Sequence, residues 1–203
     1  MFVTVEGIEG CGKSTLVAGL EERLRAAGRE IIVTREPGGT PTGDAIRQIF
    51  LEPGLRIAPL TEALLINASR AQHVLDLIEP ALRRGAIVLC DRFVDSTLAY
   101  QGYGRGIDLN FLRELCDVAT GDLVPNLTFV LDLPVAVSRE RTAFRDKGAA
   151  DRMELETPEF YEWVRRGFLD LAHRSQRYRV LDATKPPEEL AAQAYALLTE
   201  VMT

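Results

Sequence analysis

The sequence has few cysteines and few histidines, and this scarcity excludes several kinds of site. Its 203 residues include three cysteines, Cys11, Cys90 and Cys116, an odd number without metal-ligand spacing. This pattern argues against structural disulfides and against zinc, and it favours a reducing compartment. The two histidines, His73 and His173, lie apart from any cluster of carboxylates or cysteines. We expect helix-packing or surface roles for them rather than catalysis.

The sequence also lacks an excess of positive charge and any long apolar run. Its formal net charge is -6, whereas a protein that grips a nucleic-acid backbone over a broad surface needs many cationic groups. The chain opens with no basic region and has no apolar run long enough for a signal or a membrane span. We therefore expect a cytoplasmic protein that binds neither nucleic acid nor membrane. The net negative charge of the chain is still compatible with local sites for small phosphorylated ligands.

The composition that remains is that of an ordinary globular protein. Hydrophobic residues make up 46% of the chain and charged residues 27%, which is far from disordered or disulfide-rich compositions. A chain of 203 residues can bury a sizeable core as one unit. Because no internal repeat, low-complexity tract or linker is visible, we predict a single domain over residues 1–203.

Short apolar runs alternate with helical patterns along the chain. The runs are too short for helices and too continuous for one-sided strands, which indicates buried parallel strands. They span residues 2–5, 31–34, 86–90, 127–133 and 178–181. Helical periods follow residue 13 and recur over residues 61–84, 110–120, 135–144, 157–175 and 188–202. This alternation predicts an α/β fold with three α/β/α layers around a five-stranded parallel sheet.

The strongest motif follows the first predicted strand. It reads Gly7-Ile8-Glu9-Gly10-Cys11-Gly12-Lys13-Ser14, continues into Thr15, and matches the phosphate-binding pattern G-x-x-x-x-G-K-[ST]. Glycines let the main chain wrap so that its N–H groups point at phosphate oxygens, and the following helix N-terminus adds positive potential. We expect Lys13 to neutralise the β- and γ-phosphates of ATP, Ser14 to bind Mg²⁺, and Cys11 to be a spacer.

A second part of the site is predicted at the end of the third strand. Asp91 follows the apolar run at 86–90, and the carboxyl ends of parallel strands meet at one edge of the sheet. An acid after a strand is often only a turn residue or a helix cap. Beside the phosphate loop, we expect Asp91 to hold Mg²⁺ or its waters.

Several further segments indicate one kind of P-loop protein. The guanine-specifying N-K-x-D and the D-x-x-G switch of GTPases do not occur. Residues 34–40 (TREPGGT), 70–73 (RAQH), 91–93 (DRF), 96–106 (STLAYQGYGRG) and 182–184 (DAT), with residues 7–15, resemble the signature segments of bacterial thymidylate kinases in the same order. This resemblance covers residues 2 to about 189. It implies a P-loop NTPase fold with a flexible lid at about 144–153, transfer of the γ-phosphoryl of ATP to dTMP, and a homodimer.

The resemblance also assigns roles on the acceptor side. Arg70 and Arg92 would clamp the dTMP phosphate, since guanidinium offers a planar fork of donors for bidentate contact. Arg35, Pro37, Arg47 and Ser96 match further positions around the monophosphate. Gln101 and Thr97 would contact the thymine edge, Tyr100 would pack against deoxyribose, and Glu9 would reach the sugar 3′-hydroxyl.

The remaining assignments concern the lid, the adenine and a turn. The charge on the transferring group would be neutralised from the lid, by Arg145, Lys147 or Arg152, of which Arg152 fits the family pattern best. Asp182 and Ala183 resemble the loop that packs against adenine, although a plain turn between a strand and a helix is nearly as probable for them. Glu36-Pro37 is a candidate cis peptide by family likeness.

Ile66 departs from the family, which commonly has a phenylalanine there stacked on thymine, so we expect weaker thymine recognition. Two alternatives stay open within the enzymes, a deoxynucleoside kinase and another nucleoside monophosphate kinase. A P-loop regulatory protein without catalysis is the third. Outside the site, Phe160, Trp163, Val164 and Phe168 at helical spacing predict a core stripe.

Overall fold

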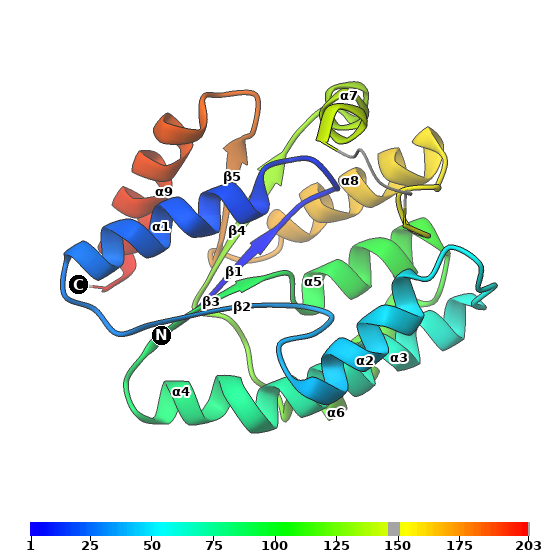
Figure 1. Cartoon of the computed structure of the whole chain (residues 1–203), viewed down its shortest axis with the longest axis horizontal. Coiled ribbons are helices and arrows are strands. Elements are labelled where there is room, and N and C mark those ends of the chain that lie inside the picture. Colours follow the sequence, from blue (N-terminus) through cyan, green and yellow to red (C-terminus); the bar gives the residue numbers. More distant parts are fainter. Residues whose placement is uncertain (146–150, 203) are drawn as a thin grey trace.

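The computed structural model describes residues 1–145 and 151–202, and of residues 144 and 145 it describes the backbone alone. A sheet of five strands forms its centre (Figure 1). The strands are β1 (Phe2–Glu6), β2 (Ile31–Arg35), β3 (Ile87–Asp91), β4 (Leu127–Asp132) and β5 (Tyr178–Asp182). All pairs are parallel, in the order β2-β3-β1-β4-β5. The predicted five-stranded parallel sheet is confirmed.

Helices cover both faces of this sheet, as predicted (Figure 1). Helices α1 (Lys13–Ala26) and α9 (Pro187–Met202) pack together on one face, and α4 (Glu79–Arg83), α5 (Val94–Thr97) and α8 (Pro158–Ala172) lie on the other. An outer group contains α2 (Pro41–Leu51), α3 (Pro59–His73) and α6 (Leu109–Thr120). The π-helical segments η1 (Val74–Ile78) and η2 (Leu98–Gly104) continue α3 and α5, and α7 (Val135–Arg145) follows β4.

Three helical regions differ from the prediction, and one of them is the run of α5 and η2, which no predicted helical pattern covers. The single helix expected over residues 61–84 is the continuous run of α3, η1 and α4, interrupted by a π-turn. Helix α2 was not predicted, although its start carries a capping signal. The Thr40 hydroxyl accepts a hydrogen bond from the Gly43 N–H, and Pro41 occupies the first turn, where its missing N–H costs nothing.

The core is apolar and is centred on the sheet. All five residues of β1 are buried, and α1 lays Leu16, Leu20 and Leu24 on the sheet. The predicted stripe on α8 is correct except for Trp163, which is 52% exposed. Trp163 precedes the buried Val164 by one residue, about 100° around the helix, and therefore lies off the stripe. Among the described residues, no helix is both long and apolar enough to cross a membrane.

Candidate nucleotide-binding site

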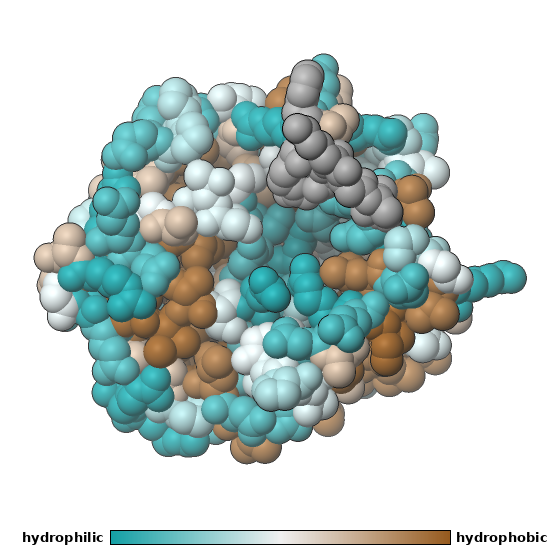
Figure 2. All heavy atoms as spheres, in the orientation of Figure 1, coloured by the Kyte–Doolittle hydropathy of each residue, from teal (hydrophilic) through white to brown (hydrophobic). Residues whose placement is uncertain are grey.

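A cavity of about 660 Å³ opens at the carboxyl ends of β1 and β3. The hollow is visible at the centre of the face in Figure 2, with hydrophilic residues around it. It gathers most of the predicted site residues from segments far apart in sequence. They are Glu9, Gly10, Cys11, Gly12, Lys13, Ser14, Thr15, Arg35, Pro37, Arg47, Ile66, Arg70, Asp91, Arg92, Ser96, Thr97, Tyr100, Gln101 and Ala183.

The phosphate loop is a tight main-chain turn between β1 and α1. Gly10 and Gly12 have φ of 67° and 97°, in the left-handed region that favours glycine. A Cβ atom on Gly10 would lie 2.8 Å from the Ser138 carbonyl oxygen, so the loop packs directly against α7. Gly12 is the N-cap of α1, so no side chain caps the first N–H groups of this helix. These groups are therefore available to an anion.

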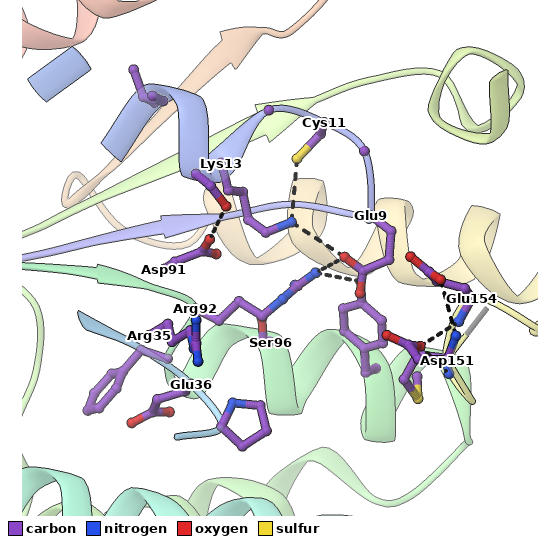
Figure 3. A pocket seen from close by; sticks show the side chains of 18 of the residues that line it. Glu9, Cys11, Lys13, Arg35, Glu36, Asp91, Arg92, Ser96, Asp151 and Glu154 are labelled. Carbon is purple, nitrogen blue, oxygen red and sulfur yellow. Dashed lines mark hydrogen bonds and ion pairs between the residues drawn. The ribbon is translucent and has the colours of Figure 1, made fainter. Parts of the chain in front are cut away.

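Lys13 and Ser14 lie at the two sides of this turn. The Lys13 ammonium donates hydrogen bonds to the carbonyl oxygens of Gly7 at 3.2 Å and Ile8 at 2.9 Å. The Ser14 hydroxyl donates to Asp91 Oδ2 at 3.0 Å, which joins α1 to the end of β3 (Figure 3). Hydroxyl and carboxylate oxygens are hard ligands of the kind that Mg²⁺ prefers, so this pair fits the predicted metal.

Cys11 is buried within the same loop. Burial raises the pKa of its thiol, although the nearby Lys13 and Arg92 oppose that shift. The thiol is therefore kept protonated, which agrees with a spacer. All three cysteines of the chain are free and buried.

Arg92 is the centre of the acceptor side. Its φ is 74°, a left-handed conformation that is uncommon for a residue with a side chain. The guanidinium donates to Gly7 O at 2.9 Å, Ser96 Oγ at 3.1 Å, Tyr100 Oη at 3.1 Å and Glu9 Oε2 at 2.5 Å. Two of these four partners, Gly7 and Glu9, belong to the phosphate loop, so Arg92 is held directly beside that loop.

Glu9 is drawn into this arrangement from the phosphate loop. Arg92 and Lys13 both approach its carboxylate (Figure 3), with Lys13 Nζ at 3.6 Å. Burial by itself would raise the pKa of Glu9, but the two cations outweigh it and lower this pKa to about 2. Glu9 is therefore an ionised acceptor at neutral pH.

Two further arginines face the same space. Arg47 Nη1 donates to Pro37 O at 3.0 Å, and the cis peptide Glu36-Pro37, as predicted, shapes this turn. Arg35 is exposed, and its guanidinium makes no hydrogen bond or ion pair with the described residues, although its main chain belongs to β2. Burial and the positive charges of Arg35 and Arg92 lower the pKa of Arg47. A cluster of cations that repel one another is stabilised by a bound dianion.

Arg70 differs from its prediction as a phosphate clamp. It is 1% exposed, and its five N–H donors are taken up by protein groups. Nε donates to Glu36 at 2.8 Å, Nη1 to Asn67 at 3.0 Å and Cys116 at 3.5 Å, and Nη2 to Phe93 O and Thr97 at 3.0 Å each. The structure therefore gives Arg70 a buried, fully hydrogen-bonded position in the cavity wall.

His73 belongs to the same buried support. It is fully buried, its Nδ1 lies 3.0 Å from Glu36 Oε1, and its Nε2 lies 2.7 Å from Thr34 Oγ1. This agrees with the helix-packing role expected for it. Glu36 thus links His73 to Arg70 and fixes the turn that carries Arg35 and Pro37.

Part of the cavity wall is apolar. Ile66 lies there with Phe50, Leu51 and Met153, and Tyr100 forms the side wall. Sequence reasoning did not identify Phe50 and Leu51, because they end the helix α2 that it also missed. The capping signal at Thr40 and Pro41 could have revealed this helix.

At the opposite end, Ala183 lines the cavity but Asp182 does not. Asp182 Oδ1 accepts from Thr184 N at 3.0 Å and caps its own turn, which is the plain interpretation weighed above. Arg141 on α7 was not identified from sequence. Its Nη1 donates to Ala183 O at 3.1 Å and it lines the cavity. Arg141 lies four residues before Arg145 on α7, and this spacing could have indicated that both belong to one face.

The predicted lid residues are only partly described. Lys147 and the Arg145 side chain lie outside the described residues. Arg152 does not line the cavity. It is ion-paired with Glu62, donates from Nε to Phe50 O at 2.9 Å and lies over the Phe50 ring. Its expected contact with the transferring phosphoryl is a prediction that this geometry does not support.

Known proteins provide an independent view of this site. The family model described as thymidylate kinase matches residues 5–194. The chain is 53% identical to a thymidylate kinase of Deinococcus radiodurans over 98% of this chain and 97% of that one. It is 54% identical to one of Thermomicrobium roseum over 99% and 95%. A crystal structure of thymidylate kinase from Ehrlichia chaffeensis superposes with a TM-score of 0.79 at 33% identity, covering 98% of both chains.

Proposed function

The chain belongs to the thymidylate kinase family and is an ATP-dependent nucleoside monophosphate kinase acting on dTMP, and on this basis we propose roles for its site residues. The γ-phosphoryl of ATP passes to a phosphate oxygen of dTMP, giving dTDP and ADP. The open alternatives of a deoxynucleoside kinase and a regulatory protein fall away, because near-full-length relatives carry the thymidylate kinase name. The whole chain is proposed to be one kinase domain.

The donor phosphates are proposed to bind the main-chain N–H groups of residues 7–15. Lys13 already lies over this loop, and moving its ammonium from two carbonyl oxygens to the β- and γ-phosphates exchanges neutral acceptors for charged ones. Mg²⁺, held by Ser14 and Asp91, would supply charge neutralisation to the transferring phosphoryl. Chelation of Mg²⁺ is expected to stop turnover and its return to restore it.

The acceptor phosphate is proposed to bind Arg92, Arg47 and Arg35. The observation that carries this proposal is that Arg35, Arg47 and Arg92, from three separate segments, line the same cavity, and the lowered pKa of Arg47 agrees with their mutual repulsion. Arg70 is assigned the support of Glu36 and Thr97 instead of direct phosphate contact. In phosphoryl transfer, the main task of the protein is to hold the donor and acceptor phosphates in line.

The sugar and base are proposed to occupy the rest of the cavity. Glu9, ionised and held by Arg92, would accept from the 3′-hydroxyl, and Tyr100 would pack on deoxyribose. The base would lie among Ile66, Phe50 and Gln101. Arg145 and Arg141, both on α7, are the proposed cations for the leaving ADP side.

A homodimer is proposed through the outer group of helices. Leu64 on α3, Phe111 and Val118 on α6 and Leu75 on η1 are large apolar side chains exposed to solvent, Val118 at 85%. Hydrophobic surface over the region of α2 and α3 is visible in Figure 2. Exposed apolar surface of this kind marks protein interfaces. Sedimentation should give twice the mass of the chain, and Leu64→Glu should shift it toward the monomer. The proposed address is the cytoplasm.

The test of the activity is an ADP-release assay over dTMP, dUMP, UMP, CMP, AMP and GMP. dTMP is expected to be the best acceptor, and ADP release without any acceptor should be slow, because a closed site limits hydrolysis. A purine acceptor used more efficiently than dTMP would refute the assignment.

A further inference from the structure

A buried carboxylate outside the phosphate sites holds the base end of the cavity together. Glu62, on α3, is 1% exposed and accepts four hydrogen bonds. Its Oε2 accepts from Gln101 Nε2 at 3.0 Å and from Arg105 Nε at 3.1 Å. Its Oε1 accepts from Arg105 Nη2 at 3.0 Å and from Arg152 Nη1. Glu62 thus joins η2 to Arg152, near the end of the predicted lid segment.

The two arginines hold this carboxylate in place. Arg105 binds both of its oxygens, lies 4.5 Å from the centre of the Phe160 ring, and also pairs with Glu156. Arg152 contributes a second guanidinium. Two cations around one buried carboxylate compensate for its desolvation, and breaking such an arrangement is costly. Glu62 is therefore a rigid acceptor for the remaining donor, the amide of Gln101.

That contact determines which way the Gln101 amide points. Both oxygens of Glu62 accept hydrogen bonds from the surrounding side chains, so the amide NH₂ of Gln101 faces Glu62 and its carbonyl Oε1 faces elsewhere. Oε1 is buried and has no partner anywhere in residues 1–145 and 151–202. Gln101 lines the cavity. A buried acceptor without a partner is unfavourable, and a ligand N–H would satisfy it.

We propose that Glu62 is a positioning residue that sets the base preference of the acceptor site, by holding the Gln101 amide with its oxygen toward the base. The proposal rests on the proposed function, which places the base at Gln101. Thymine and uracil carry a hydrogen on N3 and donate from it, whereas N3 of cytosine is an acceptor. The fixed oxygen accepts from the first two bases and repels the third. Glu62 acts only through Gln101.

Wild-type enzyme tests the amide orientation directly. dUMP and dCMP both lack the thymine methyl group, so their kcat/KM values compare the N3 and C4 edge alone. A site built to pair a substrate N–H rejects an analogue without it, and we expect dUMP to exceed dCMP by about 10²-fold. Equal use of the two would overturn the proposal. Failure to phosphorylate dTMP would instead refute the proposed function.

Variants test whether Glu62 is responsible. In Glu62→Gln the side chain offers an NH₂ that can face Gln101 Oε1, so the Gln101 amide turns and presents its N–H to the base. The ratio of dUMP to dCMP efficiency is expected to fall about tenfold. In a Gln101→Met background the same substitution should leave the ratio unchanged, since the intermediary is gone. A wild-type ratio in Glu62→Gln would contradict the proposal.

Glu156→Gln is the matched control. It weakens the other ion pair of Arg105 without touching Gln101, so the ratio should equal that of wild type. A drop in the ratio with this variant would show that the charge network in general, and not Glu62, controls the base. Should Glu62→Gln fail to fold, the wild-type comparison and Gln101→Met, which should also lower the ratio about tenfold, still decide the matter.

Discussion

The two phosphate pockets proposed for this cavity are built in opposite ways. The donor pocket uses consecutive residues 7–15, and its binding groups are main-chain amides with one lysine. The acceptor pocket uses side chains from β2, α2, the end of β3 and η2, and its binding groups are arginines. Main-chain groups need only the right turn, whereas guanidinium groups need partners that hold them in place. Each pocket therefore depends on a different part of the protein.

The surroundings of the cations also differ between the two pockets. Lys13 rests on carbonyl oxygens of its own loop. Arg47 sits beside two other cations, and its pKa is lowered by burial and by their charge. The arginines of the proposed acceptor pocket therefore repel one another, and a bound phosphate would reduce this repulsion. Four measurements test whether the two pockets differ in this way.

Lys13→Ala should produce the largest loss. The substitution removes the one side-chain cation of the donor pocket, so kcat should fall about 10³-fold while the KM for dTMP stays within about threefold. Lys185→Ala is the control, because Lys185 also lines the cavity but pairs with Glu189 at the surface. Steady-state assays measure both. Turnover of Lys13→Ala near wild type would show that this lysine is not part of the donor pocket.

Arg92→Ala should damage the acceptor pocket and leave the donor pocket intact. We expect kcat/KM for dTMP to fall about 10²-fold and the KM for ATP to change by less than about threefold, since Arg92 touches the phosphate loop only at Gly7 O and the Glu9 carboxylate and at none of its main-chain N–H groups. Arg35→Ala, an exposed arginine without protein partners among the described residues, should cost about tenfold. An equal rise in both KM values would mean that the two pockets are not separable.

Glu6, which supports Arg92 through Ser96, should make folding stability depend on pH. Glu6 accepts from Phe93 N at 2.7 Å and from Ser96 Oγ at 2.6 Å, and Ser96 in turn holds Arg92. Burial, with repulsion from Asp95, raises the pKa of Glu6 to about 8. The folded state thus holds a proton that the unfolded state loses above the ordinary value of 4.5. Stability present at acid pH is lost as pH rises from 4.5 through 8.

Denaturant unfolding between pH 5 and 8.5 should show this slope, on the order of 1 kcal/mol per pH unit at its steepest. Glu6→Gln should flatten it, and Glu22→Gln, on the exposed face of α1, should not. A wild-type unfolding free energy that rises with pH across this window would contradict the assignment of Glu6.

Ile66→Phe should give the smallest effect of the four. It tests the part of the cavity where we place the base. Ile66 lies with Phe50 in the cavity wall, and an aromatic ring there would stack on the base. Stacking adds about 1 kcal/mol beyond area burial, so the KM for dTMP should fall about fivefold with kcat unchanged. A larger KM would mean that Phe50 already fills the stacking position. Ile66→Leu, of equal volume, is the control.

The same comparison explains what could be predicted from the sequence. The sheet and the donor loop follow from local patterns, because apolar runs of strand length and a motif of fixed spacing act within a few residues. The cis Glu36-Pro37 peptide and the gathering of Arg35, Arg47 and Arg92 required the family resemblance. No spacing in the sequence indicates that these segments meet.

The residues whose contacts differ most from those expected have partners that lie far away in sequence. Arg70 was expected to face phosphate, but Glu36, Asn67 and Thr97 consume its donors. Arg152 was expected at the transferring group, but the buried Glu62 holds it. An arginine binds whichever acceptor the fold brings to it, and a buried carboxylate competes strongly with any ligand. Such competition becomes visible only when the tertiary contacts are known.

A crystal structure with dTMP and a non-hydrolysable ATP analogue tests the central claim most directly. We predict that the donor phosphates contact the main-chain N–H groups of residues 7–15 and Lys13, and that the dTMP phosphate contacts Arg92 and Arg47 while Arg70 keeps its protein partners. A dTMP phosphate bound by Arg70, or lying away from Arg92 and Arg47, would contradict the division into a main-chain pocket and an arginine pocket.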